Sequence, residues 1–234
     1  MKTLLVLTQY KRNNLEKQLI QINSQTIKPD YIVVFQNENH IDISELKKTY
    51  NFIHIKSDYN TKFFGRFAAC FTFPVDICIV MDDDIIPGNN CLNNYISQCV
   101  NLNSIIGGNG RMRFNSSIPK NKHPSDIGVR TEPIIVDYVG HLWCFKKEWL
   151  YHMFSIPPYT YDTGEDMHLC FSSRLIGGIS SYTARQLTNK DMCDITNNSL
   201  ACDEHSSFKK TSNNLREDVQ KYFIQKYNYK FIDN

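Results

Sequence analysis

Residues 77–87 read ICIVMDDDIIP, five apolar residues that run directly into Asp82, Asp83 and Asp84. The apolar run predicts a strand buried on both faces, as in a parallel sheet covered by helices. Two like charges about 4 Å apart repel by about 1 kcal/mol in bulk water and by about 4 kcal/mol at an effective dielectric near 20. A divalent cation removes this repulsion, and Mg²⁺ or Mn²⁺ binds oxygen ligands of this kind. The alternative is an acidic surface turn, since Asp is common in turns, but the apolar flanks favour a metal site.

Apolar runs and helical patterns alternate along the first half of the chain. Four strands are predicted, at residues 3–8, 31–35, 52–55 and 76–81. Three helices are predicted between them, at residues 13–25, 43–50 and 63–71. This alternation predicts an α/β fold with a mostly parallel central sheet and helices on both faces. Ligands bind such sheets beyond the carboxyl ends of the strands, so the polar loops after these four strands are expected to converge on one rim.

The second half of the chain is less regular. The glycines of residues 107–110 are predicted to end an apolar segment, and residues 115–130 are predicted to form a long polar loop. The remaining strands are expected at residues 134–139, ending at Gly140, and at residues 179–183. The remaining helices are expected at residues 147–154, 165–176 and 213–227. With no repeat and no linker, residues 1–234 are predicted to form one domain, with a nucleotide-binding half over 1–100 and an acceptor-binding half over 101–234.

Charge and hydropathy exclude several classes of partner. The 234 residues include 26 Lys plus Arg and 24 Asp plus Glu, and a net charge of +2 gives no reason to expect nucleic acid or an anionic membrane. No stretch approaches the roughly 20 apolar residues that span a bilayer. The apolar run at residues 4–7 is too short for a signal peptide. We therefore expect a soluble, cytoplasmic protein without a membrane span.

The eight cysteines contain no C-x-x-C pair, which argues against a zinc cluster. Cys78, Cys144 and Cys170 lie in apolar runs and are expected in the core. All eight are interpreted as reduced thiols of a cytosolic protein, with a Cys193–Cys202 bridge as the alternative.

The acidic stretch resembles a motif of a known enzyme family. An apolar strand, Asp-Asp-Asp, an apolar pair and Pro together look like the Asp-x-Asp motif of GT-A fold, nucleotide-sugar-dependent glycosyltransferases of the family 2 type. LVLTQYKR at residues 5–12 is similar to that family's first strand and donor loop, and KPDYIVV at residues 28–34 to the start of its second strand. The resemblance covers residues 3 to about 180. It implies a single-domain GT-A (Rossmann-like) fold and the transfer of a hexose-type sugar from a nucleotide diphosphate, with a UDP-sugar expected, to a saccharide or other hydroxyl acceptor.

The resemblance also implies which residues bind the donor and a divalent metal, Mn²⁺ or Mg²⁺. The donor-binding residues would be Thr8, Gln9 and Tyr10 around the nucleotide, Asn37 and Glu38 at the base or ribose, Asn60, Lys62, Gly65 and Arg66 at the base and diphosphate, and Asp82 and Asp83 beside them. Asp84 would hold the metal that bridges the phosphates. Elementary chemistry agrees, because a leaving nucleoside diphosphate develops negative charge that a cation and a basic side chain stabilise. For Lys62 and Arg66 the alternative is a solvated start of a helix.

Glu165 and Asp166 open a predicted helix. Transfer to a hydroxyl with inversion needs a carboxylate to take the acceptor's proton. The Glu-Asp pair resembles the base position of inverting GT-A enzymes, which makes Asp166 the base and directs Glu165 toward the acceptor or the donor sugar. The alternative is a capping box between Thr163 and Asp166, with acidic residues favoured by the helix dipole.

Three further residues are implied by the resemblance. Gly140, in a segment with Trp143, would lie near the donor sugar and the acceptor, although Trp143 is equally well explained as core. Many GT-A enzymes take a metal ligand from a His near the C-terminus, and His205 is the one His after His168. The predicted metal ligands are therefore Asp82, Asp84 and His205, with a merely exposed His205 as the alternative.

Two other functions are compatible with an acidic cluster on an α/β sheet. A sugar-phosphate nucleotidyltransferase usually has a glycine-rich loop after the first strand, whereas residues 8–14 contain no glycine. A non-catalytic module that binds nucleotide sugars would keep the carboxylates but show no turnover. The residues do not decide between inversion and retention, or identify the sugar and the acceptor.

Overall fold

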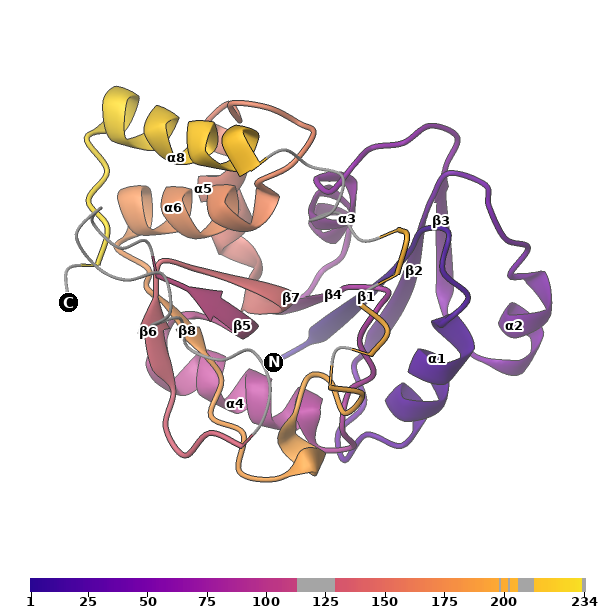
Figure 1. The fold of residues 1–234 in the computed structure, drawn as a ribbon. Helices are drawn as coiled ribbons and strands as arrows, with labels where there is room; N and C mark the ends of the chain where they lie inside the picture. Colours follow the sequence, from indigo (N-terminus) through magenta and orange to yellow (C-terminus); the bar gives the residue numbers. More distant parts are fainter. Residues whose placement is uncertain (113–128, 198, 202, 206–212, 233–234) are drawn as a thin grey trace.

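A computed structural model describes residues 1–112, 129–197, 199–201, 203–205 and 213–232. Within these residues the chain forms an eight-stranded sheet in the order β3-β2-β1-β4-β7-β5-β8-β6. The pairings of β1 with β2 and β4, of β2 with β3 and of β5 with β8 are parallel, and the others are antiparallel. Helices cover both faces of the sheet, with α5, α6 and α8 stacked above it in the view of Figure 1 and α4 below it. The predicted α/β fold with a mostly parallel sheet is confirmed.

The first half of the chain follows the predicted alternation closely. Its strands are parallel neighbours: β1 (Thr3–Gln9), β2 (Tyr31–Asn37), β3 (Ile53–Ser57) and β4 (Ile77–Met81). Its helices are α1 (Leu15–Asn23), α2 (Ser44–Thr49) and α3 (Gly65–Ala68), the last continued by a 3₁₀ turn over Ala69–Thr72. All five residues of β4 are buried, as the continuous apolar run predicts for a central strand covered by helices.

The second half departs from the prediction around its glycines. It contains α4 (Cys91–Leu102), β5 (Ile105–Arg111), β6 (Ile134–Val136), β7 (Tyr138–Lys146), α5 (Leu150–Ser155) after a 3₁₀ turn, α6 (Glu165–Gly177), β8 (Ser181–Thr183) and α8 (Asn213–Tyr227). The glycines at 107–110 lie inside β5 rather than ending it, and the strand expected to end at Gly140 instead breaks at Asp137 and continues through Gly140 to Lys146. The predicted polar loop lies largely outside the described residues, which omit 113–128.

A tight strand contact explains the glycines of β5. A Cβ atom on Gly107 would lie well inside van der Waals contact with Cβ of Val139, on the antiparallel neighbour β7. One on Gly110 would collide in the same way with Thr183 of β8. The glycines therefore allow β5 to lie close to its neighbouring strands. In sequence alone, a run of glycines is more typical of a turn, which explains the different prediction.

The core is apolar and contains the cysteines that the sequence placed there. Trp143 and Trp149 are buried, and Phe171 of α6 packs against Phe223 of α8 with ring centroids 5.3 Å apart. The seven described cysteines are free and buried, while Cys202, the partner in the alternative bridge, lies outside the described residues. Cys78, Cys144 and Cys170 are among them, so their predicted core position is confirmed.

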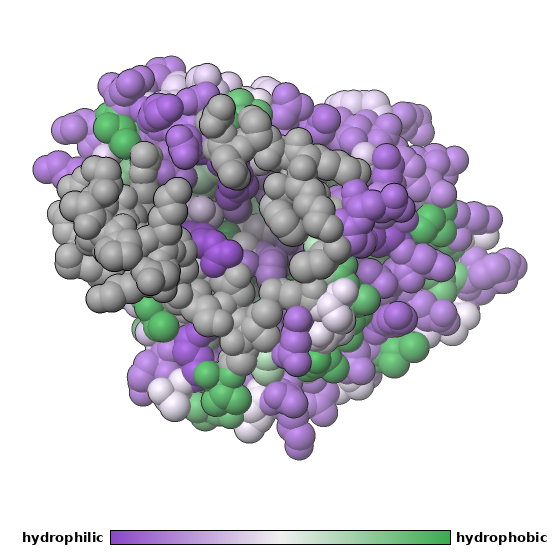
Figure 2. All heavy atoms as spheres, viewed as in Figure 1, coloured by the Kyte–Doolittle hydropathy of each residue, from purple (hydrophilic) through white to green (hydrophobic). Residues whose placement is uncertain are grey.

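The surface shows no broad apolar region among the described residues of the face in Figure 2. Hydrophobic side chains form small, separate patches there among hydrophilic ones. Across the part of the chain that the structure describes, no helix has both the length and the apolar character needed to cross a membrane. Scattered exposed hydrophobic side chains of this kind are normal for a folded protein surface.

We predict that Gly107→Ala destabilises the fold through the contact between β5 and β7. The added methyl group has no room beside Val139, and overpacking of this kind typically costs about 1–3 kcal/mol. Chemical denaturation should therefore show a lower free energy of unfolding for this variant. Ser97→Ala, on the exposed side of α4, is the control and should stay within about 0.5 kcal/mol of the parent chain. Equal stability of the two variants would contradict this account of β5.

Candidate functional site

The predicted rim forms where β1, β2, β3 and β4 end. The backbone N–H of Tyr10, just after β1, donates to Oδ2 of Asp83 at 3.2 Å. The loop after β2 contacts the loop after β3, since Nδ2 of Asn37 donates to Oδ1 of Asn60 at 3.0 Å. Because these strands are parallel neighbours, their carboxyl ends lie on one edge of the sheet. The convergence of polar loops that the sequence predicted is thus present.

Arg66 is the central cation of this rim. It is 3% exposed, and its guanidinium forms an ion pair with Asp82 and donates to Oε1 of Glu165 at 3.0 Å. It also donates to Oγ1 of Thr8 at 3.2 Å and lies 4.7 Å from the ring centroid of Trp143. Burial disfavours the charged form, but the carboxylates of Asp82 and Glu165 raise the pKa of Arg66 above its ordinary value. The alternative of a solvated helix start is wrong for this residue.

Arg12 forms ion pairs with the other two aspartates of the triplet, Asp83 and Asp84. Its Nη1 lies 2.5 Å from Oδ1 of Asp83 and 3.2 Å from Oδ2 of Asp84. Its Nε and Nη2 both donate to the carboxylate of Asp203 at 2.7 Å, which is a bidentate pair. Burial raises the pKa of Asp83 to about 6 even though Arg12 acts against that rise. The loop after β1 and the segment at residues 203–205 are therefore tied to the acidic triplet.

Asp84 is the least satisfied carboxylate of the triplet. Its Oδ1 is buried and has no hydrogen-bond partner, and burial together with Asp82 and Asp83 raises the pKa of Asp84 to about 8. Nδ1 of His205 is likewise buried without a partner. His205 lines a hollow of about 350 Å³ together with Arg12 and Asp203 among others, and Arg12 is also the ion-pair partner of Asp84. A carboxylate oxygen and an imidazole nitrogen left unpaired in this way fit a divalent cation.

The ligand set itself is not assembled in the described part of the chain. No group of three or more His, Cys, Asp or Glu side chains there is placed to hold a metal ion. Asp82 faces Arg66, and Nε2 of His205 lies 3.6 Å from Glu204. The assignment of Asp82, Asp84 and His205 as metal ligands therefore stays a prediction.

The predicted nucleotide side of the rim is a network of amides. Oδ1 of Asn37 accepts from both the N–H and the hydroxyl of Thr61, and Nδ2 of Asn60 donates to the hydroxyl of Tyr10 at 3.0 Å. Gln9 is buried and donates to the carbonyl of Arg12. Glu38 and Lys62 both have positive φ, 69° and 53°, which is uncommon outside glycine. Gly65 lies so close to Thr61 that a Cβ atom would collide with its hydroxyl.

Gly140 lies on β7, next to the acidic loop. β7 pairs with β4, and the N–H of Asp82 donates to the carbonyl of His141 at 2.9 Å. A Cβ atom on Gly140 would lie 2.8 Å from Oδ1 of Asn109. Trp143, on the same strand, is both core and site, because it is buried and its ring faces the guanidinium of Arg66.

Glu165 and Asp166 begin α6, and Glu165 is joined to the rim through Arg66. The helix N-cap is Gly164, with φ of 83°, and it has no side-chain capping bond, so the alternative of a capping box between Thr163 and Asp166 is excluded. Glu165 is 5% exposed, and burial together with the charge of Asp166 raises its pKa to about 7. Oδ2 of Asp166 accepts from Nη2 of Arg216 at 2.6 Å, and its Oδ1 accepts from the N–H of Met167.

Four residues of this site were missed from the sequence. Arg12, Gln18 and Arg216 pair with the predicted acidic residues or their backbone, and Asp203 pairs with Arg12. Gln18 offered a signal, since it is a polar residue on the buried face of α1. Its Nε2 donates to the carbonyls of Asp82 and Ile85 at 2.7 and 2.9 Å. Arg216 offered none, because its partner is 50 residues away.

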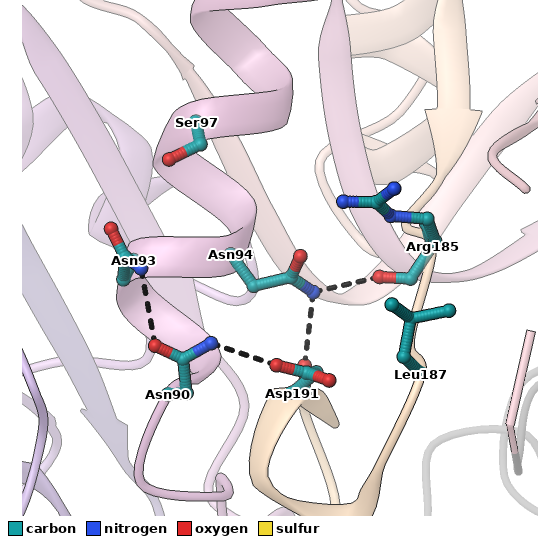
Figure 3. Close-up of a pocket in the computed structure, with 7 residues that line it drawn as sticks. All are labelled: Asn90, Asn93, Asn94, Ser97, Arg185, Leu187 and Asp191. Atoms are coloured by element: carbon teal, nitrogen blue, oxygen red, sulfur yellow. Dashed lines mark hydrogen bonds between the residues drawn. The ribbon is translucent and has the colours of Figure 1, made fainter. Parts of the chain in front are cut away.

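A second hollow, of about 260 Å³, lies between α4 and the segment at residues 185–191 and is shown in Figure 3. Asn90 donates to Asp191 at 2.7 Å and accepts from Asn93, while Asn94 donates to the carbonyls of Arg185 and Asp191. Most of the amide groups that line this hollow are therefore engaged with one another or with the backbone. The network joins α4 to the segment after β8.

Comparison with known proteins matches the fold and not the sequence. Neither a protein-family model nor a curated protein matches this chain. S. aureus TarS aligns with a TM-score of 0.55 and 13% identity, over 82% of this chain and 38% of that one. TarS 1-349 aligns with a TM-score of 0.55 and 14% identity, over 79% of this chain and 60% of that one. The complex of TarS 1-349 with UDP-GlcNAc aligns with a TM-score of 0.54 and 12% identity, over 80% of this chain and 59% of that one. The fold is GT-A-like.

The likeness to TarS shows the fold alone. This chain spans less than two thirds of the length of each of the three chains that it matches. At identities this low, the likeness concerns the course of the backbone, and the site residues have to be argued from their own contacts.

We predict that Gln18→Leu loosens the acidic loop. The substitution leaves the carbonyls of Asp82 and Ile85 without their donor, and an unsatisfied buried polar group costs about 1–3 kcal/mol. The free energy of unfolding, measured by denaturant titration, should fall by about 2 kcal/mol. Lys17→Leu, at the exposed neighbouring position of α1, is the control. An unchanged stability of Gln18→Leu would show that the loop does not depend on this side chain.

Proposed function

We propose that this chain is a metal-dependent glycosyltransferase that moves a hexose-type sugar from a nucleotide diphosphate, a UDP-sugar, to a hydroxyl of a saccharide or other acceptor. One observation carries the proposal. Arg66 contacts both Asp82 and Glu165, which brings the acidic loop after β4 and the Glu165–Asp166 pair into one buried site at the carboxyl rim. Perturbed carboxyl groups gathered with buried arginines at such a rim are typical of functional sites.

The comparisons support the same class of reaction. The GT-A-like backbone matches TarS, and one of the matching TarS structures is a complex with UDP-GlcNAc. In the proposal, Tyr10, Asn37 and Asn60 contact the nucleotide, with Thr8, Gln9, Glu38, Lys62 and Gly65 around them. Gly140 is proposed to lie near the donor sugar and the acceptor.

Asp82, Asp84 and His205 are proposed to hold Mn²⁺ or Mg²⁺ with the diphosphate. The unpaired Oδ1 of Asp84 and Nδ1 of His205 support this assignment. The bound ion would supply positive charge that stabilises the leaving diphosphate. Arg66 adds a fixed positive charge at the same place, and Arg12 holds Asp83 and Asp84 in position.

Asp166 is proposed as the general base of an inverting, single-displacement reaction. Its carboxylate removes the proton of the acceptor hydroxyl while that oxygen bonds to the anomeric carbon. The bond from the anomeric carbon to the diphosphate breaks, and the nucleoside diphosphate leaves with the bonding electron pair. Glu165, held by Arg66, is proposed to be oriented toward the acceptor or the donor sugar.

Binding and turnover of UDP-GlcNAc test this function. Thermal unfolding with UDP-GlcNAc should show a rise in apparent stability that depends on Mn²⁺, because a ligand that binds only the folded state stabilises it. Slow release of UDP should follow, with water as the acceptor. Binding without UDP release would indicate a non-catalytic module, and release of pyrophosphate from UTP and a sugar phosphate would indicate a nucleotidyltransferase. No response to any of a panel of nucleotide sugars would refute the proposal.

We predict that Asp84→Ala abolishes the Mn²⁺-dependent part of donor binding. The substitution removes the buried oxygen that has no partner within the chain. At a ligand concentration about 100 times Kd, the parent chain should gain about 2.7 kcal/mol, and the variant should lose the difference between measurements with and without Mn²⁺. Glu16→Ala, an exposed carboxylate on α1, should behave like the parent chain. A manganese effect that survives in Asp84→Ala would rule out this ligand.

We predict that Asp166→Ala keeps donor binding and loses turnover. Removal of a general base typically lowers the rate by about 10²–10⁴-fold. Isothermal titration with UDP and Mn²⁺ measures binding, and UDP release measures turnover. Glu45→Ala, on the exposed face of α2, serves as the matched control. Turnover of Asp166→Ala at the parent rate would show that another group takes the proton.

A further inference from the structure

The C-terminal helix reaches into the candidate site through one side chain. Nη2 of Arg216, in the first turns of α8, donates to Oδ2 of Asp166 at 2.6 Å. Nη1 of the same guanidinium lies 3.4 Å from Oγ1 of Thr163, and its central carbon lies 5.7 Å from the ring centroid of Tyr138. The carboxylate of Asp166 raises the pKa of Arg216 above its ordinary value. Arg216 is therefore positively charged and contacts the first turn of α6 through Asp166.

Apolar packing fixes where α8 lies and hence where Arg216 points. Phe223 of α8 contacts the rings of His168 and Phe171 on α6, with centroids 5.4 and 5.3 Å apart. Val219, one turn earlier, lies against Gly164, where a Cβ atom would be 3.0 Å from a methyl of Val219. Figure 1 shows α8 stacked along α6 on the outer side of the sheet. The docking of α8 thus presents Arg216 to the N-terminal end of α6.

Two consecutive carboxylates at this position each have their own arginine. Glu165 pairs with Arg66, which comes from α3, and Asp166 pairs with Arg216, which comes from α8. Both carboxylates are buried, and a buried charge left without a partner is strongly destabilising. Of these two carboxylates, Arg66 compensates only Glu165, so Asp166 depends on Arg216 for its compensating positive charge.

We propose that Arg216 is a positioning residue for the proposed base Asp166, so that α8 completes the active site. This inference rests on the proposed function. Arg216 holds one oxygen of the carboxylate and the N–H of Met167 holds the other. A carboxylate accepts about four hydrogen bonds, so lone pairs remain for an acceptor hydroxyl. The pair of contacts fixes the carboxylate's orientation and keeps it from turning toward Glu165.

A purely structural role for Arg216 makes different predictions. If Arg216 only anchors α8, its loss lowers stability and the amount of active protein without changing the reaction of the molecules that remain folded. If it positions Asp166, its loss lowers kcat at constant donor affinity, because its contacts are with Asp166, Thr163 and Tyr138 and not with the proposed donor-binding residues. Separate measurement of kcat and of KM for the donor therefore distinguishes the anchoring role from the positioning role.

The test uses the full chain, Mn²⁺, UDP-GlcNAc as donor and water as acceptor, with UDP release as the readout. Arg216→Ala should lower kcat by about 10²-fold, as expected for a misplaced catalytic group, with KM for the donor changed by less than about threefold. Arg216→Lys should recover part of kcat, because it restores the charge but not the planar fork of donors. Guanidinium chloride at low millimolar concentration should raise the kcat of Arg216→Ala and leave the parent chain unchanged.

The matched control is Lys221→Ala, which removes a cation from the exposed side of α8, where Lys221 pairs with Asp218. It should retain the kcat of the parent chain. Thermal unfolding of every variant shows whether the folded fraction has changed. A kcat of Arg216→Ala equal to that of the control, or a loss that neither Lys nor guanidinium restores, would overturn the positioning role while leaving the proposed function intact. A parent chain that releases no UDP would overturn both.

Discussion

A guanidinium that is almost fully buried has to be compensated where it lies, and Arg66 is compensated by carboxylates from two distant parts of the chain. Breaking such a pair by removing one partner costs about 3–5 kcal/mol, whereas replacing the whole set with apolar groups is often neutral or stabilising. Stability alone therefore gives no reason to place ions here. In the proposed function, this cluster of Arg66, Asp82 and Glu165 meets the charge of the donor, and its geometry links the loop after β4 to the start of α6.

Two other arginines around the rim likewise compensate carboxylates. Arg12 compensates Asp83 and Asp84 from the loop after β1, and Arg216 compensates Asp166 from α8. Most of the acidic oxygens thus have a partner within the chain. Oδ1 of Asp84 is a buried exception, and it lies in the loop where the sequence pattern places a metal. In the proposed function, this unpaired oxygen is the one that would bind the cation.

Local patterns predicted most of the fold, and long-range contacts explain what was missed. The C-terminal helix at Asn213–Tyr227 and the strand at Ile77–Met81 were predicted because their signals lie within a few residues. The glycines of β5 were misread, since the need for them arises from Val139 on another strand. The acidic residues of the candidate site and Arg66 were named from the sequence, whereas the other two arginine partners, Arg12 and Arg216, were not. Pairing of Arg216 with Asp166 depends on how α8 packs on α6, which no local pattern contains.

The neighbours Glu165 and Asp166 differ in surroundings, and the difference divides their proposed roles. Glu165 is enclosed between Arg66 and the body of α6, with its side chain 7% exposed, whereas that of Asp166 is 13% exposed and pairs with the more open Arg216. This difference agrees with the proposed role of Asp166 as the base that contacts the acceptor. Burial and the adjacent charge raise the pKa of Glu165 to about 7, so a proton held there relieves the repulsion between the two carboxylates. The more buried carboxyl group, that of Glu165, can thus take up a proton, which removes its negative charge from beside Asp166.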